Sequence, residues 1–180
     1  MSEPVGSLAE LKELLEGKEQ YVFQNREFPF YSVLIYSRVK GLNHHLHEYV
    51  SGNAEGFNGL TGPNWLVAVL ENVHAKDPGA FRPEDVYPIA RFLGVRVDEI
   101  PALVFFTDPK ARSDLFVLNL GWIMSDLEGP EGYHEEGINK IFTKIAAGID
   151  EICALGGGQD RMADLQSFLN KEFIRPGSES

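Results

Sequence analysis

The sequence predicts an α/β protein: a mixed sheet of about four to five strands flanked by helices, with extra helices at the two ends of the chain. Short apolar runs alternate with segments of helical periodicity along the chain. Strand–helix–strand units require parallel pairing with right-handed crossovers. The last two apolar runs are separated only by a turn, which predicts an antiparallel hairpin.

The first elements are a helix and a central strand. Ser7 is a good N-cap, and the leucines that follow it recur at helical spacing until Gly17. Residues 21–28 are either a first strand or an extended lead-in. Residues 30–39 are β-branched and aromatic, and they are apolar on both faces at the centre. This pattern predicts a strand that is covered on two sides.

The middle of the chain alternates helix and strand. Residues 42–50 predict a short helix, whereas the glycine-rich residues 51–64 predict a loop by composition. Residues 65–73 predict a second buried strand. The apolar spacing within 83–93 predicts a helix with proline in its first turn, which Gly94 ends.

The remaining elements are a hairpin and two helices. Residues 102–106 and 115–121 predict the two hairpin strands, and isoleucines from Ile138 to Ile152 form the stripe of a long helix. Three glycines end this helix, a final helix follows, and we expect residues 175–180 to be disordered. We divide the chain into an N-terminal helix with its lead-in (1–29), a central domain (30–155) and a C-terminal hinge, helix and tail (156–180).

Composition excludes several classes of function. Against 16 basic residues the chain has 27 acidic ones, a formal net charge of −11, so binding to nucleic acid or to an anionic membrane is not expected. No apolar run approaches a membrane span, and the first residues lack the pattern of a secretory signal. We therefore expect a cytoplasmic protein. One cysteine, Cys153, cannot form an internal disulfide or a zinc site by itself.

One stretch carries a family resemblance. Residues 89–109, "IARFLGVRVDEIPALVFFTDP", resemble the short helix, Gly-Val turn, Ile-Pro and following strand of the thioredoxin-like fold. The later "LFVLNLG" resembles the fifth strand of that fold and the glycine that ends it. The resemblance spans about residues 30–153. It implies that the Ile100–Pro101 bond is cis, with Pro101 at a strand start where its missing N–H breaks no ladder.

The chain departs from that family at the redox motif. The resemblance places the motif just after the central strand, where residues 40–43 read "KGLN" and contain no cysteine. Because the dithiol mechanism needs two sulfurs at a helix N-terminus, a disulfide oxidoreductase is excluded. We interpret Cys153 as a core residue of the long helix. The inserted "VDE" before Ile100 lengthens the loop that carries the proline.

The resemblance implies a redox-inactive domain that binds a protein or peptide. In this fold the loop before the proline presents backbone groups to an extended partner, a mode that needs no cysteine. We expect an anionic group of the partner to be able to dock at the helix N-terminus near Arg38 and Lys40. No catalytic residue and no cofactor are expected. The expected partner-binding residues are Lys40, Gly41, Leu42, Asn43, Asp98, Glu99, Ile100 and Pro101.

Two alternatives remain open. His44, His47 and Glu48 stand at i, i+3 and i+4, so on a helix they could face one metal ion, with His74 or His134 as a further ligand. A solvated polar face is the plainer interpretation. The alternative function is a metal-binding protein or a non-redox enzyme that uses this helix face, although an enzyme is the less expected outcome. The terminal helices have apolar stripes that are too wide to remain exposed to solvent. They either fold back over the sheet or pack against another copy in a homo-oligomer.

Overall fold

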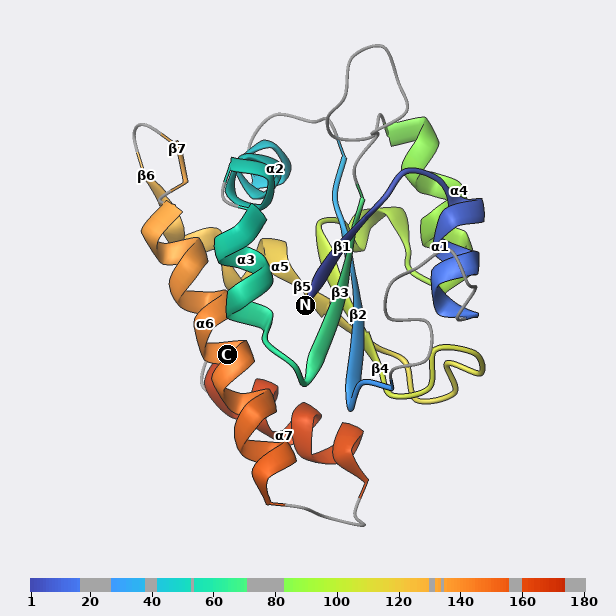
Figure 1. Ribbon diagram of the computed structural model, residues 1–180. Helices are drawn as coiled ribbons and strands as arrows, with labels where there is room; N and C mark the ends of the chain where they lie inside the picture. Colours follow the sequence, from blue (N-terminus) through green and yellow to red (C-terminus); the bar gives the residue numbers. More distant parts are fainter. Residues whose placement is uncertain are drawn as a thin grey trace.

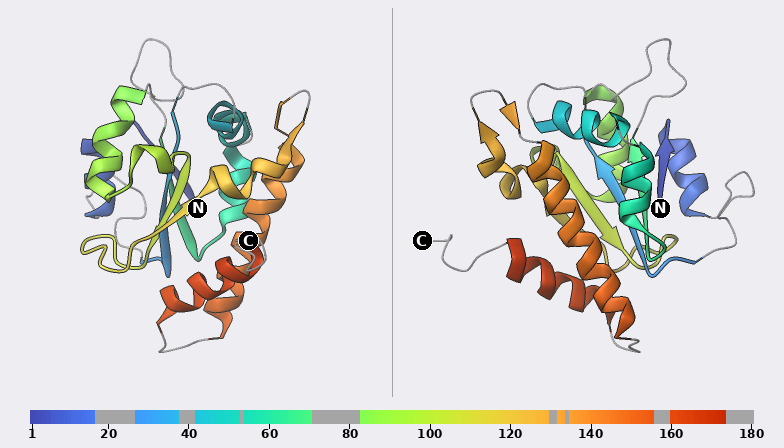
Figure 2. Two further views of the ribbon diagram at one scale, coloured as in Figure 1. Left: turned by 180° about the vertical axis from the view of Figure 1, so that it is seen from behind. Right: turned by 60° about the vertical axis from the view of Figure 1, so that its left-hand side comes forward.

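The fold is an open five-stranded mixed sheet with helices on both faces (Figures 1 and 2), which confirms the predicted fold class. The computed structural model describes residues 1–16, 27–37, 42–52, 54–70, 83–129, 132–133, 135–155 and 160–173. The strands of the main sheet are β1 (Ser2–Val5), β2 (Phe30–Ile35), β3 (Trp65–Leu70), β4 (Ala102–Phe106) and β5 (Phe116–Asn119).

The helices surround this sheet. They are α1 (Leu8–Leu15), α2 (Leu42–Gly52), α3 (Ala54–Thr61), α4 (Pro83–Leu93), α5 (Leu120–Ile123), α6 (Glu135–Ala154) and α7 (Arg161–Phe173). Two 3₁₀ turns, η1 (Val97–Glu99) and η2 (Ser125–Leu127), and a small hairpin of β6 (Glu128–Gly129) and β7 (Gly132–Tyr133) complete the described elements.

The strand order is β1-β3-β2-β4-β5. β3 pairs in parallel with β1 and β2, whereas β4 is antiparallel to both β2 and β5. The parallel β2–β3 pair and the β4–β5 hairpin agree with the predicted pairing. The parallel orientation expected for the second strand–helix–strand unit, β3–α4–β4, is wrong, because β4 runs antiparallel to β2 and therefore opposite to β3. β1 was not predicted, because its sequence "SEPV" is short and lacks an apolar alternation.

The sheet separates two hydrophobic cores. Successive side chains of a strand point to opposite faces. Leu34 and Phe105 therefore pack in the core under α2, α3, α6 and α7, whereas Ile35 and Phe106 pack in the core under α1 and α4. Every residue of β2, β3 and β4 is buried, as expected for strands covered on two sides.

Both terminal helices fold back onto the same chain, which is one of the two arrangements expected from the sequence. Ser7 caps α1, since its Oγ accepts from the Glu10 N–H at 3.1 Å. The apolar stripes of both helices are buried: Leu11, Leu14 and Leu15 in α1, and Met162, Leu165 and Leu169 in α7. α7 packs so closely on α6 that a Cβ on Gly148 would lie 2.4 Å from Phe168 Cε1.

Two further sequence predictions are wrong. Residues 54–61, expected in a loop, form α3, because Phe57 is buried and this packing outweighs the poor helix propensity of glycine. The strand expected over 115–121 ends at Asn119, whose side chain caps α5 by accepting from the Trp122 N–H. Most of 21–28, the 156–158 hinge and the 175–180 tail lie outside the described residues.

Candidate functional site at the carboxyl edge of the sheet

The site is built at one edge of the sheet, where three strands that are distant in sequence meet. In register, Ile35 at the end of β2 pairs with Ala102 at the start of β4, and Ala102 pairs with Asn119 at the end of β5. This is the carboxyl edge of the parallel strands. Open α/β sheets bind their ligands outside this edge, because the loops there converge.

The 95–101 loop reaches this edge with a rigid internal structure. Its centre is the 3₁₀ turn η1, closed by an Arg96 N–H that donates to Glu99 Oε1 at 2.9 Å. The Arg96 guanidinium also lies 3.3 Å from Asp98 Oδ1, with both side chains exposed. Val97 remains 54% exposed between these charges. The loop therefore offers an apolar side chain flanked by polar ones.

The proline that opens β4 fastens the loop to the sheet. The Ile100–Pro101 bond is cis, as the family resemblance implied. Pro101 is buried, and its carbonyl accepts from the Leu120 N–H of α5 at 3.0 Å. Ile100 is half-buried against the core below α4. The 95–101 loop and α5 thus form one continuous rim of the carboxyl edge.

The start of α2 is held at the same edge, next to the end of β2. Arg38, Lys40 and Gly41 lie outside the described residues. Asn43, which was expected to hydrogen-bond a partner, accepts from the Ser37 N–H at 3.0 Å and so holds the start of α2 against the end of β2. Leu42 is buried, so its side chain serves the core rather than a surface.

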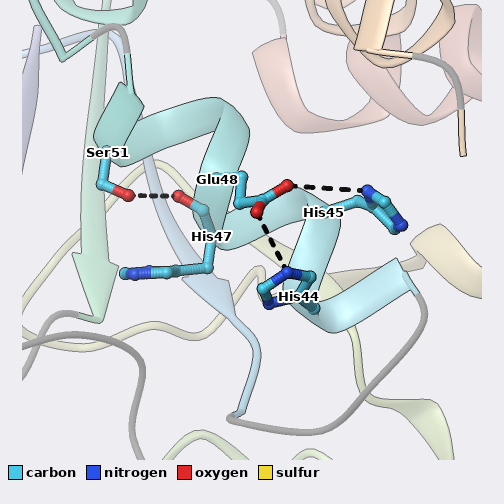
Figure 3. A network of polar contacts seen from close by, with 5 residues as sticks. All are labelled: His44, His45, His47, Glu48 and Ser51. Carbon is cyan, nitrogen blue, oxygen red and sulfur yellow. Dashed lines mark hydrogen bonds and ion pairs between the residues drawn. The ribbon is translucent and has the colours of Figure 1, made fainter.

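The histidines of α2 divide between two directions (Figure 3). His44 Nε2 lies 3.0 Å from Glu48 Oε1, and His45 Nδ1 lies 3.8 Å from Glu48 Oε2. His47 points the other way, where its Nδ1 is 3.4 Å from the hydroxyl of buried Tyr36. The prediction that these residues lie on a helix is confirmed, but the sequence did not predict the directions of their side chains.

These directions weigh against the proposed metal site. His44, His47 and Glu48 do not converge, and among the described residues no three His, Cys, Asp or Glu side chains form a group that could hold a metal ion. The candidate ligands His74 and His134 lie outside the described part of the chain. The His44–Glu48 pair is more than half exposed, as on a solvated helix face.

Cys153 lies at the opposite end of the molecule from this edge. It follows Asp150, whose carboxylate accepts from Asn64 Nδ2 at 2.9 Å just before β3 begins. The thiol is half-buried and packs against the larger core, and this burial raises its pKa. A raised thiol pKa lowers the fraction of reactive thiolate at neutral pH. Its position agrees with a structural rather than a redox role.

The structure also places an aromatic side chain at the site that the sequence did not single out. Trp122 in α5 is 80% exposed, whereas Trp65 is fully buried in β3. α5 follows β5 directly at the carboxyl edge, so Trp122 belongs to the same rim as the 95–101 loop. The only signal in the sequence was a tryptophan next to Gly121, at the end of a predicted strand.

Comparison of the chain with protein-family models, with curated proteins and with solved structures found no match. No helix in the described part of the chain is both long and apolar enough to cross a membrane.

Proposed function

We propose that this protein is a redox-inactive, thioredoxin-like domain that binds an extended segment of a protein partner at the carboxyl edge of its sheet. The observation that carries the proposal is the rim formed by the 95–101 loop and α5, joined by the hydrogen bond between Leu120 and Pro101. This rim presents exposed Val97 and Trp122 on a backbone that is already fixed.

The fold supports the likeness to that family at a general level. The sheet combines the expected parallel pair and antiparallel hairpin, and a proline stands directly before β4. The segment after β2, which would carry a dithiol, contains no cysteine. A domain of this kind has lost the electron chemistry but keeps the surface against which an extended chain can lie.

A rigid rim favours binding. Association loses free energy whenever loops must be ordered, so surfaces that are ordered beforehand bind more tightly. Arg96, Asp98 and Glu99 satisfy one another, and the carbonyl of Pro101 is used by α5. The rim thus offers two exposed apolar side chains, Val97 and Trp122, flanked by charged ones, as in the apolar centre and polar rim of a protein interface.

Affinity capture tests the proposal. Tagged wild-type chain, Val97→Asp, Ile100→Ala and Lys40→Ala are each incubated with a cell extract, and the bound proteins are quantified by mass spectrometry. We expect a partner captured by the wild type to fall about tenfold or more with Val97→Asp, because a buried charge at an interface centre is costly. Ile100→Ala and Lys40→Ala should weaken capture as well.

Leu155→Ala is the matched control, since Leu155 is 78% exposed but lies beyond the last turn of α6, at the far end of the molecule. It should capture the partner as the wild type does. Thermal unfolding of each variant separates lost binding from lost folding. Equal capture of the same proteins by all the folded variants would refute a partner site at the 95–101 loop.

A further inference from the structure

Trp122 is an exposed aromatic side chain on a fixed backbone. The backbone N–H of Trp122 donates to Asn119 Oδ1 at 3.2 Å, and its backbone carbonyl accepts from Ser125 Oγ at 3.0 Å. On either side of it, Leu120 and Met124 are buried in the larger core. The short helix therefore cannot turn the indole inwards without losing these contacts. Tryptophan is enriched among the residues that contribute most of the binding energy in protein interfaces.

The chain around Trp122 is strongly acidic. Residues 113–139 include six Asp and Glu and no Lys or Arg. Among the described residues of this stretch, Asp126 in η2 and both Glu135 and Glu136 at the start of α6 are exposed. The described chain that follows Trp122 is therefore negatively charged at its surface.

From this arrangement we propose that Trp122 anchors a basic segment of the partner, with an Arg or Lys side chain lying over the indole and its neighbours facing the surrounding carboxylates. A cation over the face of an indole is attracted by the ring, and tryptophan gives the strongest such contact. Nearby carboxylates add attraction to the same cation. The inference rests on the proposed function, and it names the chemistry and the orientation of the partner.

The two tryptophans make a direct test possible. The indole N–H of Trp122 has no partner among the hydrogen bonds of the described residues, whereas that of Trp65 donates to buried Ser32 Oγ at 2.8 Å. In a ¹⁵N-labelled protein these two groups give separate NMR signals. We titrate the full chain with a short synthetic peptide in which Arg and Val alternate, and with a matched peptide in which Glu replaces every Arg.

The inference predicts that the Arg peptide shifts the Trp122 signal in a saturable manner and leaves the Trp65 signal in place. Trp122→Ala should weaken the binding of this peptide about tenfold or more, and Asp126→Asn by a smaller factor that disappears at high ionic strength. Leu155→Ala should bind as the wild type does. The Glu peptide should produce no saturable shift.

Three outcomes would overturn the inference. One is equal binding of both peptides, and another is no shift of Trp122 with either of them. The third is a Trp122 shift that grows with protein concentration alone, which would assign the surface to a second copy of this chain. Failure of the proposed function would give a different result. In that case the Arg peptide would still bind through Trp122, but Val97→Asp would change neither the affinity for the peptide nor the capture of a protein partner. If Val97→Asp abolishes capture and Trp122→Ala does not, only the basic anchor is refuted.

Discussion

At the scale of single residues, a buried polar side chain in this protein forms a hydrogen bond with a side chain on a neighbouring strand. Trp65 Nε1 donates to Ser32 Oγ at 2.8 Å between neighbouring strands, with both side chains buried. Ser32→Ala would leave the indole N–H buried without an acceptor. We expect the free energy of unfolding to fall by about 1–3 kcal/mol, measured by urea denaturation.

Ser125→Ala is the control for this substitution. Ser125 also makes a side-chain hydrogen bond, but at an exposed position. Its loss should change stability by no more than about 0.5 kcal/mol, because water replaces the missing partner. Equal effects of the two substitutions would mean that burial does not increase the contribution of the Trp65–Ser32 hydrogen bond to the free energy of unfolding.

A second residue-scale prediction concerns Tyr49. Burial, assisted by the nearby charge of Glu135, raises the pKa of this phenol from about 10 to about 12, and its hydroxyl donates to Asn139 Oδ1 at 2.7 Å. Below pH 10 the group is neutral in both the folded and the unfolded chain. Between pH 10 and 12 the unfolded chain loses this proton first, so the folded state loses stability as the pH rises.

Tyr49→Phe removes this contribution. The stability of the wild type, measured by urea denaturation, should fall relative to Tyr49→Phe as the pH increases from 10 towards 12. At pH 10 the tyrosinate absorbance of the folded wild type and of Tyr49→Phe should be equal, because Tyr49 ionises only at higher pH. A stability difference that stays constant over this range would show that Tyr49 ionises with its ordinary pKa in the folded protein.

The residues that could be predicted from sequence are those whose role is local. Ser7 caps α1, and Gly94 ends α4 with a φ of +73°, a conformation that favours glycine. The directions of His47 and Trp122 could not be predicted in the same way. They depend on Tyr36 and on the α5 cap respectively, and both are set by the packing of elements that are separate in sequence.

At the scale of elements, α3 is the clearest case in which packing overrides composition. Its glycines favour a loop, but Phe57 packs edge-on against both Tyr49 and Phe142, which stack on each other, and this packing fixes the helix. The Cβ of an alanine at Gly59 would meet nothing within 4 Å. We expect Gly59→Ala to raise the free energy of unfolding by about 0.5–1 kcal/mol, since alanine loses less backbone entropy in a helix.

Gly62→Ala is the contrasting variant. This position also has open space, but its φ is +68°, where a Cβ is strained. Here alanine should lower stability by about 1–2 kcal/mol. Paired urea denaturation curves measure both changes. If both substitutions destabilised the protein equally, residues 54–61 would not be helical in solution.

The contact between α6 and α7 gives another element-scale prediction. An alanine Cβ at Gly148 would come within 2.4–2.8 Å of three ring atoms of Phe168. Gly148→Ala should therefore destabilise the protein by about 1–3 kcal/mol, measured by thermal or urea unfolding. Adding Phe168→Leu makes room and should recover part of the loss. Additive effects of the two substitutions would contradict direct contact between these positions.

The edge strand β1 shows the limit of pattern reading for elements. Its four residues include Glu3 and Pro4, and no alternation identifies them as a strand. Pairing with β3 nevertheless forms, because an edge strand tolerates proline where no neighbour needs its N–H. Long segments such as α6 were predictable because their periodicity persists over several turns.

At the scale of the whole molecule, the sheet separates two ends of different character. The carboxyl edge gathers the 95–101 loop, the start of α2 and α5, whereas Cys153 and Leu155 lie at the end of α6, beyond its Asp150–Asn64 contact. The sequence could predict the loop and its proline from the family resemblance. It could not predict that α5 and Trp122 join them, since this depends on strand register between β4 and β5.

Hydrogen–deuterium exchange of the chain, alone and bound to a captured partner, tests the proposed site most directly. We predict that protection increases in residues 96–102 and 119–124, the two segments that meet through the Leu120–Pro101 hydrogen bond, and stays unchanged in residues 150–155. Protection confined to the α6–α7 end, with the carboxyl edge exchanging as in the free protein, would contradict a partner site at this edge.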